Sequence, residues 1–393
     1  MLKWNKVYEQ QVADLATDFI EIRSYTGEER ELALFLKNKM LEFGYDEAWI
    51  DELGNVIGKV VGKKPGKKVL FDGHLDTVVA NNTKAWKTNP FQAVIADGKL
   101  YGRGATDMKG ALAAMIYAGA LVAQNRENFA GEYYISGTVH EEIAEGVSLR
   151  AVLTRVKPDL VIIGEASELK LNIGQRGRGE ILLETFGVPA HSANPQKGKN
   201  AVYDMCHLVE AFRAHEMERD ELLGAAIMEL TDIISEPYPG TSIVPAYCKA
   251  TFDRRLLPGD SKQAILAELE EVIVKTKQKY PTIEAKVSIA KNSFKTYTDF
   301  PIDEDKFAPA WKMEKDADFV VKTLASLRLA SIEPILHAYS FCTNGSSSAG
   351  ERHIPTLGFG PGREEEAHID NEFIELEQIY KAVQGYYCLA MNS

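Results

Sequence analysis

Hydrophobic residues in the first half of the chain occur in two kinds of pattern. Short apolar segments predict buried strands, at residues 68–72, 132–138 and 160–163. Longer stretches with helical spacing predict two helices, over the Ala-rich segment 109–124 and from a capping box at Thr26 to Gly44. Strands that alternate with helices indicate an α/β fold with a largely parallel central sheet.

The middle of the chain has a different order of elements. Strand (β) and helix (α) patterns follow one another as βαββαβ, over residues 180–188, 199–213, 225–234, 246–256, 261–279 and 283–290. This order is typical of a ferredoxin-like α+β domain. A helix is then predicted over 316–329 and a short strand over 356–360. We therefore expect a discontinuous α/β domain, 1–179 and 293–393, interrupted by an inserted domain at 180–292.

Length and charge narrow the class of protein. A chain of 393 residues is long enough for two domains. Its net charge of −12 lacks the basic excess that phosphate contacts need, which argues against nucleic-acid or membrane partners. No stretch approaches the ~18 apolar residues of a membrane span, and the N-terminal residues lack the apolar run of a signal peptide. Four scattered cysteines without a CxxC pair are typical of reduced thiols, so we expect a cytoplasmic protein.

Histidine and carboxylate residues gather where predicted strands end or helices begin. They are His74, Asp76, Asp107, Glu141, Glu142, Glu165 and His368. Ligands of open α/β sheets bind beyond the carboxyl ends of strands, so we expect these residues to converge on one crevice. Clustered carboxylates repel one another unless a cation compensates them, and imidazole with carboxylate suits Zn²⁺ or a related divalent metal. The set predicts two metal ions that share a bridging carboxylate and activate a water molecule.

Each of these pieces also has an ordinary structural explanation. A histidine at a strand end is usually only hydrogen-bonded, a Glu-Glu pair is usually solvated, and Gly-rich segments usually mark turns. Their joint occurrence at strand ends favours a catalytic cluster. Two alternatives stay open elsewhere: His191 could belong to a structural turn, and Arg255 could form a strand-edge ion pair with Asp253. The neighbouring Arg254 is expected to be solvated.

The same segments resemble a family of enzymes. They occur in the family's order and are GHLDTV (73–78), YGRGATDMKGALAA (101–114), GTVHEEIAEG (137–146), IIGEAS (162–167), GQRGRGEI (174–181), HSANPQKGKNA (191–201), FDRRLLPGD (252–260), GFGPG (358–362) and EEEAHIDNEFI (364–374). The family is that of the co-catalytic zinc hydrolases and metallopeptidases, which include acetylornithine deacetylase, succinyl-diaminopimelate desuccinylase, aminoacylase and glutamate carboxypeptidase. The HLDTV, ATDMKG and TNGSSS segments look most similar to a subgroup of selenium-metabolism-linked hydrolases.

The resemblance implies a zinc-peptidase-like catalytic domain with an inserted ferredoxin-like lid or dimerisation domain. It also implies two divalent ions, most often Zn²⁺, with Co²⁺ or Mn²⁺ as alternatives. One ion would be held by His74, Asp107 and Glu165, and the other by Asp107, Glu142 and His368.

The resemblance further implies roles for residues around the metals. Asp76 would orient His74 through a hydrogen bond, and Glu141 would be the general base. The peptide between Asp107 and Met108 would be cis.

Substrate recognition follows from the resemblance in the same way. His191 would reach across a homodimer interface and stabilise the oxyanion, while Arg255 would hold a substrate carboxylate. Asn344 and Gly345 lie in the loop that would contact the substrate. The family loop commonly reads Gly-Gly-Thr-Asp where this chain has TNGSSS. The lid segment of the family often carries Asn-Val-Ile-Pro where this chain has TSIVP (241–245). Both segments concern substrate recognition, so the identity of the substrate stays open.

The expected activity is hydrolysis of the amide bond of a small N-acyl amino acid, N-carbamoyl amino acid or dipeptide by a metal-bridged hydroxide, with Glu141 taking the proton. The alternative is a catalytically degenerate protein of the same fold that binds metal or peptide. A degenerate member would typically lack the base, and this chain has it.

Overall fold

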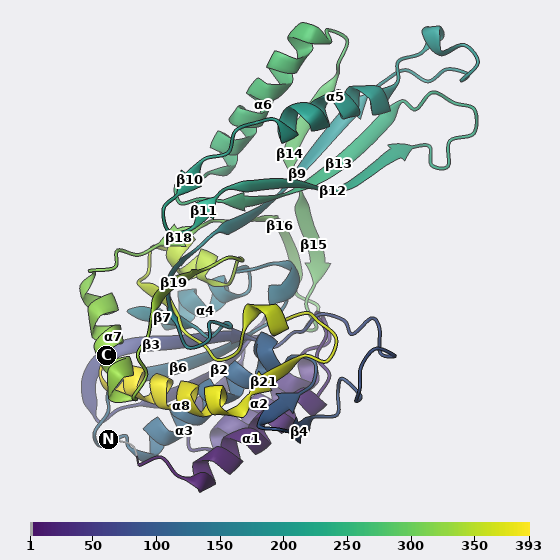
Figure 1. Ribbon diagram of the computed structural model, residues 1–393. Helices are drawn as coiled ribbons and strands as arrows, with labels where there is room; N and C mark the ends of the chain where they lie inside the picture. The colour runs from purple at the N-terminus through teal and green to yellow at the C-terminus, as the bar shows by residue number, and fades with distance from the viewer. Residues whose placement is uncertain (1–2) are drawn as a thin grey trace. The chain divides into compact units, whose positions relative to one another are not determined.

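The computed structural model describes residues 3–393 (Figure 1). The chain forms two compact units. The large unit contains the residues up to Gln175 together with Ser293–Ile302 and Trp311–Ser393. The small unit contains Arg176–Asn292 and Asp303–Ala310.

A nine-stranded mixed sheet forms the centre of the large unit. Its order is β1-β2-β6-β3-β7-β20-β8-β18, and β19 also pairs with β8. The strands are β1 (Glu47–Ile50), β2 (Val56–Val61), β3 (Lys64–His74), β6 (Ala130–Thr138), β7 (Leu160–Ile163), β8 (Leu171–Gln175), β18 (Trp311–Lys312), β19 (Leu336–Tyr339) and β20 (Thr356–Gly358).

The prediction of a largely parallel sheet is confirmed for the strands β6, β3, β7 and β20, which pair in parallel. The pairs β1–β2, β2–β6, β20–β8 and β8–β18 are antiparallel instead. Strands β1 and β2 are joined by a short loop, which allows only an antiparallel pair, whereas parallel neighbours need a long crossover.

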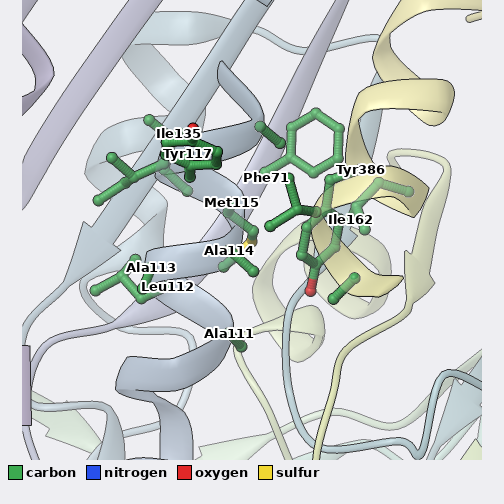
Figure 2. Close-up of a cluster of buried hydrophobic side chains, with 14 of the residues drawn as sticks. Phe71, Ala111, Leu112, Ala113, Ala114, Met115, Tyr117, Ile135, Ile162 and Tyr386 are labelled. Carbon is green, nitrogen blue, oxygen red and sulfur yellow. The ribbon is translucent and has the colours of Figure 1, made fainter. Parts of the chain in front are cut away.

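Six α-helices belong to the described part of the large unit. They are α1 (Lys6–Glu21), α2 (Arg30–Glu42), α3 (Gly110–Gln124), α4 (Leu149–Val156), α7 (Asp318–Leu329) and α8 (Leu376–Met391). Helix α3 is buried over nearly its whole length, because its small alanines let neighbouring elements approach on every side. Figure 2 shows α3 beside Phe71 of β3, Ile162 of β7 and Tyr386 of α8. This core holds the carboxyl ends of the central strands in fixed positions.

The helix expected to begin at Thr26 begins at Arg30 instead, so the predicted capping box is wrong. The N-cap residue is Glu29, whose side chain makes no cap hydrogen bond. The hydroxyl of Thr26 donates to Asp76 Oδ2 at 2.8 Å, and this long-range partner takes the place of a helix cap.

A three-stranded sheet of order β21-β5-β4 brings the C-terminal part of the chain beside the segment before α3. Its strands are β4 (Val94–Ala96), β5 (Lys99–Tyr101) and β21 (Phe373–Glu375). Phe373 pairs with Tyr101, and this register places the chain after His368 next to the chain before Asp107.

The small unit has a five-stranded antiparallel sheet of order β12-β13-β9-β14, in which β17 also pairs with β9. Its elements are β9 (Gly177–Phe186), α5 (Ala201–Arg213), β10 (Arg219–Asp220), β11 (Gly224–Ala225), β12 (Ile227–Glu236), β13 (Tyr247–Leu256), α6 (Lys262–Lys279), β14 (Ala285–Ile289) and β17 (Phe307–Ala308). The main elements follow the predicted order βαββαβ. When β9, β12, β13 and β14 are counted 1 to 4 along the chain, their order across the sheet is 2-3-1-4, as in ferredoxin-like domains. Strands β15 (Lys291–Lys295) and β16 (Pro301–Asp305) form a separate two-stranded sheet.

Arg254 is buried, so the expectation that it is solvated is wrong. Its Nη1 and Nη2 donate to the two carboxylate oxygens of Glu268, each at 2.8 Å. A guanidinium can be buried at such a site because the carboxylate neutralises its charge and accepts two of its hydrogen bonds.

No helix among residues 3–393 is both long and apolar enough to cross a membrane. The four cysteines, which all lie in this described part, are free thiols.

Candidate metal centre

The residues predicted to bind metal all belong to the large unit. His74 is the last residue of β3, and Glu165 lies two residues after the end of β7. Glu142 lies in the one-turn helix Glu141–Ile143 after β6, and Asp107 lies in the turn Ala105–Lys109 before α3. Since β6, β3 and β7 are parallel neighbours, their carboxyl ends meet at one edge of the sheet.

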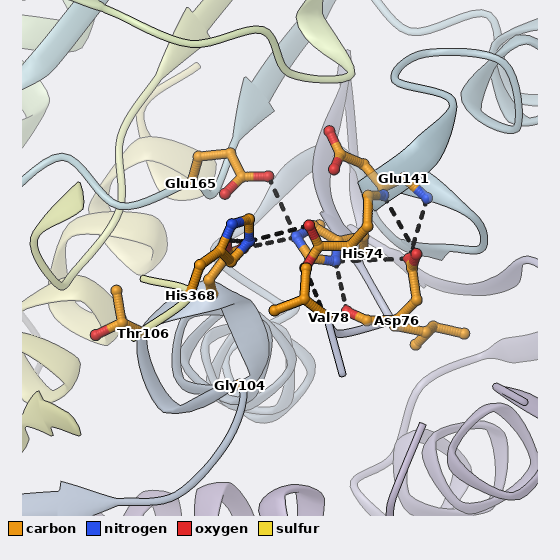
Figure 3. Close-up of polar contacts among 12 residues, drawn as sticks. His74, Asp76, Val78, Gly104, Thr106, Glu141, Glu165 and His368 are labelled. Atoms are coloured by element: carbon orange, nitrogen blue, oxygen red, sulfur yellow. Dashed lines mark hydrogen bonds and ion pairs between the residues drawn. The ribbon is translucent and has the colours of Figure 1, made fainter. Parts of the chain in front are cut away.

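The carboxylate of Asp107 lies between two histidines. Its Oδ1 is 2.9 Å from Nε2 of His74, and its Oδ2 is 2.9 Å from Nε2 of His368. His368 Nε2 is also 3.0 Å from Glu142 Oε2, and His74 Nε2 is 3.5 Å from Glu165 Oε1. Figure 3 shows His74 and His368 pointing toward each other, with Glu165 beside them. The structure therefore brings together all five residues that the sequence nominates as ligands.

Asp76 makes the expected hydrogen bond to His74, and it does so through its backbone oxygen. His74 Nδ1 is hydrogen-bonded to the backbone oxygen of Asp76 at 2.8 Å, while the nearest carboxylate oxygen is 3.6 Å away. The carboxylate instead accepts hydrogen bonds from the backbone N–H groups of Glu141, at 3.0 Å, and Glu142, at 3.2 Å. Asp76 thus fixes His74 through its main chain and the Glu141–Glu142 turn through its side chain (Figure 3).

The peptide bond between Asp107 and Met108 is cis, as predicted.

Burial and mutual repulsion shift the pKa values of the cluster. Burial, with the charge of Asp107, raises the pKa of Glu142 to about 7. Burial raises the pKa of Glu165 to about 8 against the opposing effect of His74. Burial raises the pKa of Glu141 well above its usual value. The hydrogen bonds with Asp107 and Glu142 raise the pKa of His368 to about 10. The raised carboxylate pKa values arise because burial and neighbouring carboxylates oppose ionisation. Such carboxylates ionise readily only when a positive charge lies beside them.

The donor set fits divalent cations. Ligand atoms of His74, Asp107 and Glu142 lie within 4.8 Å of one another, and so do those of His74, Glu141 and Glu165. Glu141 Oε1 is buried and has no hydrogen-bond partner within the described chain. Imidazole and carboxylate groups around one bridging carboxylate are suitable ligands for a pair of Zn²⁺-like ions.

The loop residues Asn344 and Gly345 are buried in the large unit, and their polar groups already have partners. Asn344 Nδ2 donates to Asp72 Oδ2 at 2.9 Å and to Thr138 Oγ1 at 2.8 Å. The N–H of Gly345 donates to the hydroxyl of Thr343 at 3.0 Å. A Cβ at position 345 would lie 2.6 Å from the indole nitrogen of Trp311, so the close packing there requires glycine. In this structure both residues serve to shape the loop.

His191 and Arg255 lie in the small unit. His191 is exposed, and its Nδ1 accepts a hydrogen bond from the N–H of Ala193 at 3.0 Å. Arg255 Nε forms the ion pair with Asp253 that was one of its two interpretations, at 2.8 Å. The other oxygen of Asp253 accepts a hydrogen bond from Nε of Arg178 at 2.9 Å, so the two arginines share this carboxylate.

Two buried acids near the site were not singled out from the sequence. Glu372 accepts hydrogen bonds from the turn that carries Asp107, and Glu29 accepts one from the N–H of His140 at 3.1 Å. Glu372 belongs to the motif around His368, whereas Glu29 is the glutamate of the capping box predicted at Thr26. The one sequence feature that could have indicated the burial of Glu372 is its position directly before the apolar residues Phe373 and Ile374.

Comparison with known proteins decides the family. The model of the peptidase family M20/M25/M40 matches residues 70–392. The chain belongs to this family. The M20 family comprises hydrolases that act on peptide and other amide bonds, so the fold and the cluster described above are those of a metallohydrolase family.

Three similar proteins place this M20 chain among its relatives. It is 30% identical over 378 residues to "Uncharacterized protein YgeY" of Escherichia coli (strain K12), covering 95% of this chain and 92% of that protein. It is 31% identical over 255 residues to "Succinyl-diaminopimelate desuccinylase 2" of Ruegeria sp. (strain TM1040), covering 62% and 64%. The solved structure of the Bacillus subtilis YXEP protein, described as a dinuclear metal binding peptidase, superposes with a TM-score of 0.73 at 14% identity and 98% coverage of both chains.

Proposed function

We propose that this M20 protein is a metal-dependent hydrolase of the amide bond in a small N-acyl amino acid, N-carbamoyl amino acid or dipeptide. The observation that carries the proposal is the carboxylate of Asp107, whose two oxygens lie 2.9 Å from two different histidines. A shared carboxylate of this kind is the arrangement expected for two adjacent metal ions.

Two divalent ions, Zn²⁺ with Co²⁺ or Mn²⁺ as alternatives, fit the ion pairs around each histidine. His74 with Asp107 and Glu165 would hold one ion, and His368 with Asp107 and Glu142 would hold the other. Such ions supply Lewis acidity, which lowers the pKa of a water molecule and polarises a carbonyl group.

Glu141 is the proposed general base. It follows β6, its backbone is held by Asp76, and its Oε1 has no partner within the described residues. A carboxylate so placed can take a proton from the attacking water and return it to the leaving nitrogen.

Recognition of the substrate is proposed for four residues outside the metal cluster. Arg255 is proposed to hold a substrate carboxylate with the planar guanidinium that suits two parallel hydrogen bonds. His191, which is exposed, is proposed to stabilise the oxyanion of a partner subunit in a homodimer. Asn344 and Gly345 are proposed to form the wall of the loop against which the substrate lies.

The homodimer is supported by the free edge of the small sheet. Strand β12 is the first in the order β12-β13-β9-β14, and its residues Ile233 and Ile234 are exposed. An uncovered edge with apolar side chains favours pairing with another strand. A cytoplasmic location is proposed on the basis of the four free cysteines.

The experiment that tests the function is a substrate screen with the metal-loaded protein. N-acyl amino acids, N-carbamoyl amino acids and dipeptides are each offered with a free and with an amidated carboxylate. We expect turnover of at least one class, which falls by a factor of about 10² or more in Glu141→Ala while the metal content stays near that of wild type. Metal-independent binding of these compounds without turnover would instead identify a degenerate binding protein.

A further inference from the structure

Glu372 is a fully buried acid that accepts four hydrogen bonds from one turn of the chain. Its Oε2 accepts from Nη1 of Arg103 at 2.7 Å and from the N–H of Gly104 at 3.0 Å. Its Oε1 accepts from the N–H groups of Thr106, at 2.8 Å, and Asp107, at 3.0 Å. Both oxygens of the carboxylate are therefore engaged by the turn that carries the proposed bridging ligand.

The main chain on both sides reinforces this contact. The N–H of Gly102 donates to the backbone oxygen of Glu372 at 3.0 Å, and the hydroxyl of Thr106 donates to the backbone oxygen of Phe373 at 2.6 Å. The segment before Asp107 is thus joined to the segment after His368 by side-chain and main-chain hydrogen bonds together.

A carboxylate is well suited to this position. The turn before α3 is not helical at Asp107, whose φ is −124° and ψ is 92°, so its backbone N–H groups need acceptors from elsewhere. An ionised carboxylate offers about four acceptor sites and forms the stronger, charge-assisted hydrogen bonds. Arg103, also buried, supplies the opposite charge that makes burial of the acid possible.

His368 lies four residues before Glu372 in the sequence. The same side chain that holds the N–H of Asp107 therefore also anchors the segment carrying the histidine that meets Asp107 Oδ2 at 2.9 Å. A displacement of either segment would separate the two groups that, under the proposed function, share a metal ion.

We propose that Glu372 is a positioning residue of the metal centre, which sets the geometry of Asp107 and His368 and thereby the affinity of the ion held by Asp107, Glu142 and His368. This inference rests on the proposed function, because it takes for granted that the cluster binds metal. Glu372 itself binds no metal, since both of its oxygens accept hydrogen bonds from the protein.

The test is a titration of metal-depleted protein with Co²⁺, followed by calorimetry and by the visible absorption of the bound ion. Wild type, Glu372→Gln and the control Glu365→Gln, an exposed acid of the same segment, are compared. In Glu372→Gln the side-chain NH₂ group would face N–H groups of the turn that carries Asp107. Two hydrogen-bond donors would then meet, and hydrogen bonds to the turn would be lost. We therefore expect at least one Co²⁺ ion to bind 10- to 100-fold more weakly than in wild type and the absorption bands to change, with the control unchanged.

The outcomes separate the two proposals. A wild-type protein that binds no Co²⁺ contradicts the proposed function itself. Wild-type binding together with unchanged affinities and spectrum in folded Glu372→Gln overturns the role of Glu372 alone. Should Glu372→Gln not fold, Arg103→Lys replaces it, because it keeps the positive charge but removes the guanidinium N–H that donates to Glu372 Oε2. A smaller loss of Co²⁺ affinity supports the role, and an unchanged affinity and spectrum overturns it.

Discussion

The carboxylate of Asp76 holds the backbone of Glu141, whose N–H donates to Oδ1 at 3.0 Å. The backbone oxygen of the same aspartate binds Nδ1 of His74 at 2.8 Å. One residue therefore connects a proposed metal ligand with the proposed general base, but through different atoms. Substitution of the side chain should disturb the base while leaving the orientation of the histidine intact.

The first prediction concerns Asp76→Asn. The amide nitrogen would face backbone donors, so we expect kcat to fall by about 10- to 100-fold while the metal content remains close to wild type. Thr26→Val is the control, because it removes one hydrogen bond to Asp76 Oδ2 and leaves both backbone contacts. Metal loss in Asp76→Asn equal to its loss of activity would show that the carboxylate mainly supports the proposed metal ligands, of which Glu142 donates its N–H to Asp76 Oδ2.

Local patterns predicted the elements well where burial is uniform. The apolar run at 160–163 is strand β7, and the Ala-rich segment is helix α3 from Gly110 to Gln124. The predicted start of α2 was wrong because Thr26 finds its hydrogen-bond partner fifty residues away, at Asp76. Such partners are set by the tertiary fold, which local spacing does not describe.

In the candidate site, too, some features could be predicted from local patterns, whereas others depend on contacts that only the folded chain makes. Histidine and carboxylate types at strand ends were enough to nominate the ligands, because the parallel strands bring those ends together. Glu372 was not singled out because the groups it binds lie 265 to 269 residues away in the chain. The burial of Arg254 was also missed, since its partner Glu268 is on a helix that packs over the strand only after folding.

The second prediction concerns the pH dependence of stability. Burial, together with the charge of Asp76, raises the pKa of Glu29 from 4.5 to about 7. Between these values the folded protein holds a proton that the unfolded chain has released, so this group lowers stability as the pH rises. The groups around it are Asp76, the N–H of His140 and Tyr297.

Glu29→Gln should remove this dependence. Relative to the variant, wild type should lose up to roughly 3 kcal/mol of unfolding free energy as the pH rises from about 4.5 to 8. Denaturant unfolding of both proteins at several pH values measures the difference. Glu28→Gln, at the exposed neighbouring acid, should run parallel to wild type. A difference between wild type and Glu29→Gln that does not vary with pH would contradict the assignment.

The third prediction separates the two interpretations of Arg255. If it binds a substrate carboxylate, Arg255→Gln should raise KM by about 10- to 100-fold with little change in kcat, and only for substrates with a free carboxylate. Arg178→Gln is the matched control, because Arg178 binds the same Asp253. An equal effect of the two substitutions would mean that the ion pair with Asp253 is what matters.

The fourth prediction concerns the assembly. Light scattering should show a homodimer, and Ile233→Lys on the edge strand β12 should convert it to a monomer, because the two-fold symmetry brings the new charge into the interface twice. Val321→Lys, at an equally exposed apolar residue of α7, should leave the dimer intact. A wild-type monomer with full activity would rule out the action of His191 on a partner subunit.

The central claim is that Asp107 joins two metal ions that the hydrolysis of an amide requires. The most direct measurement is amide hydrolysis by the metal-depleted wild-type protein during stepwise addition of Zn²⁺. We expect almost no turnover at the start and a plateau at two equivalents of Zn²⁺ per chain. Turnover that is unchanged after complete depletion, with the loss of metal verified by elemental analysis, would contradict the claim.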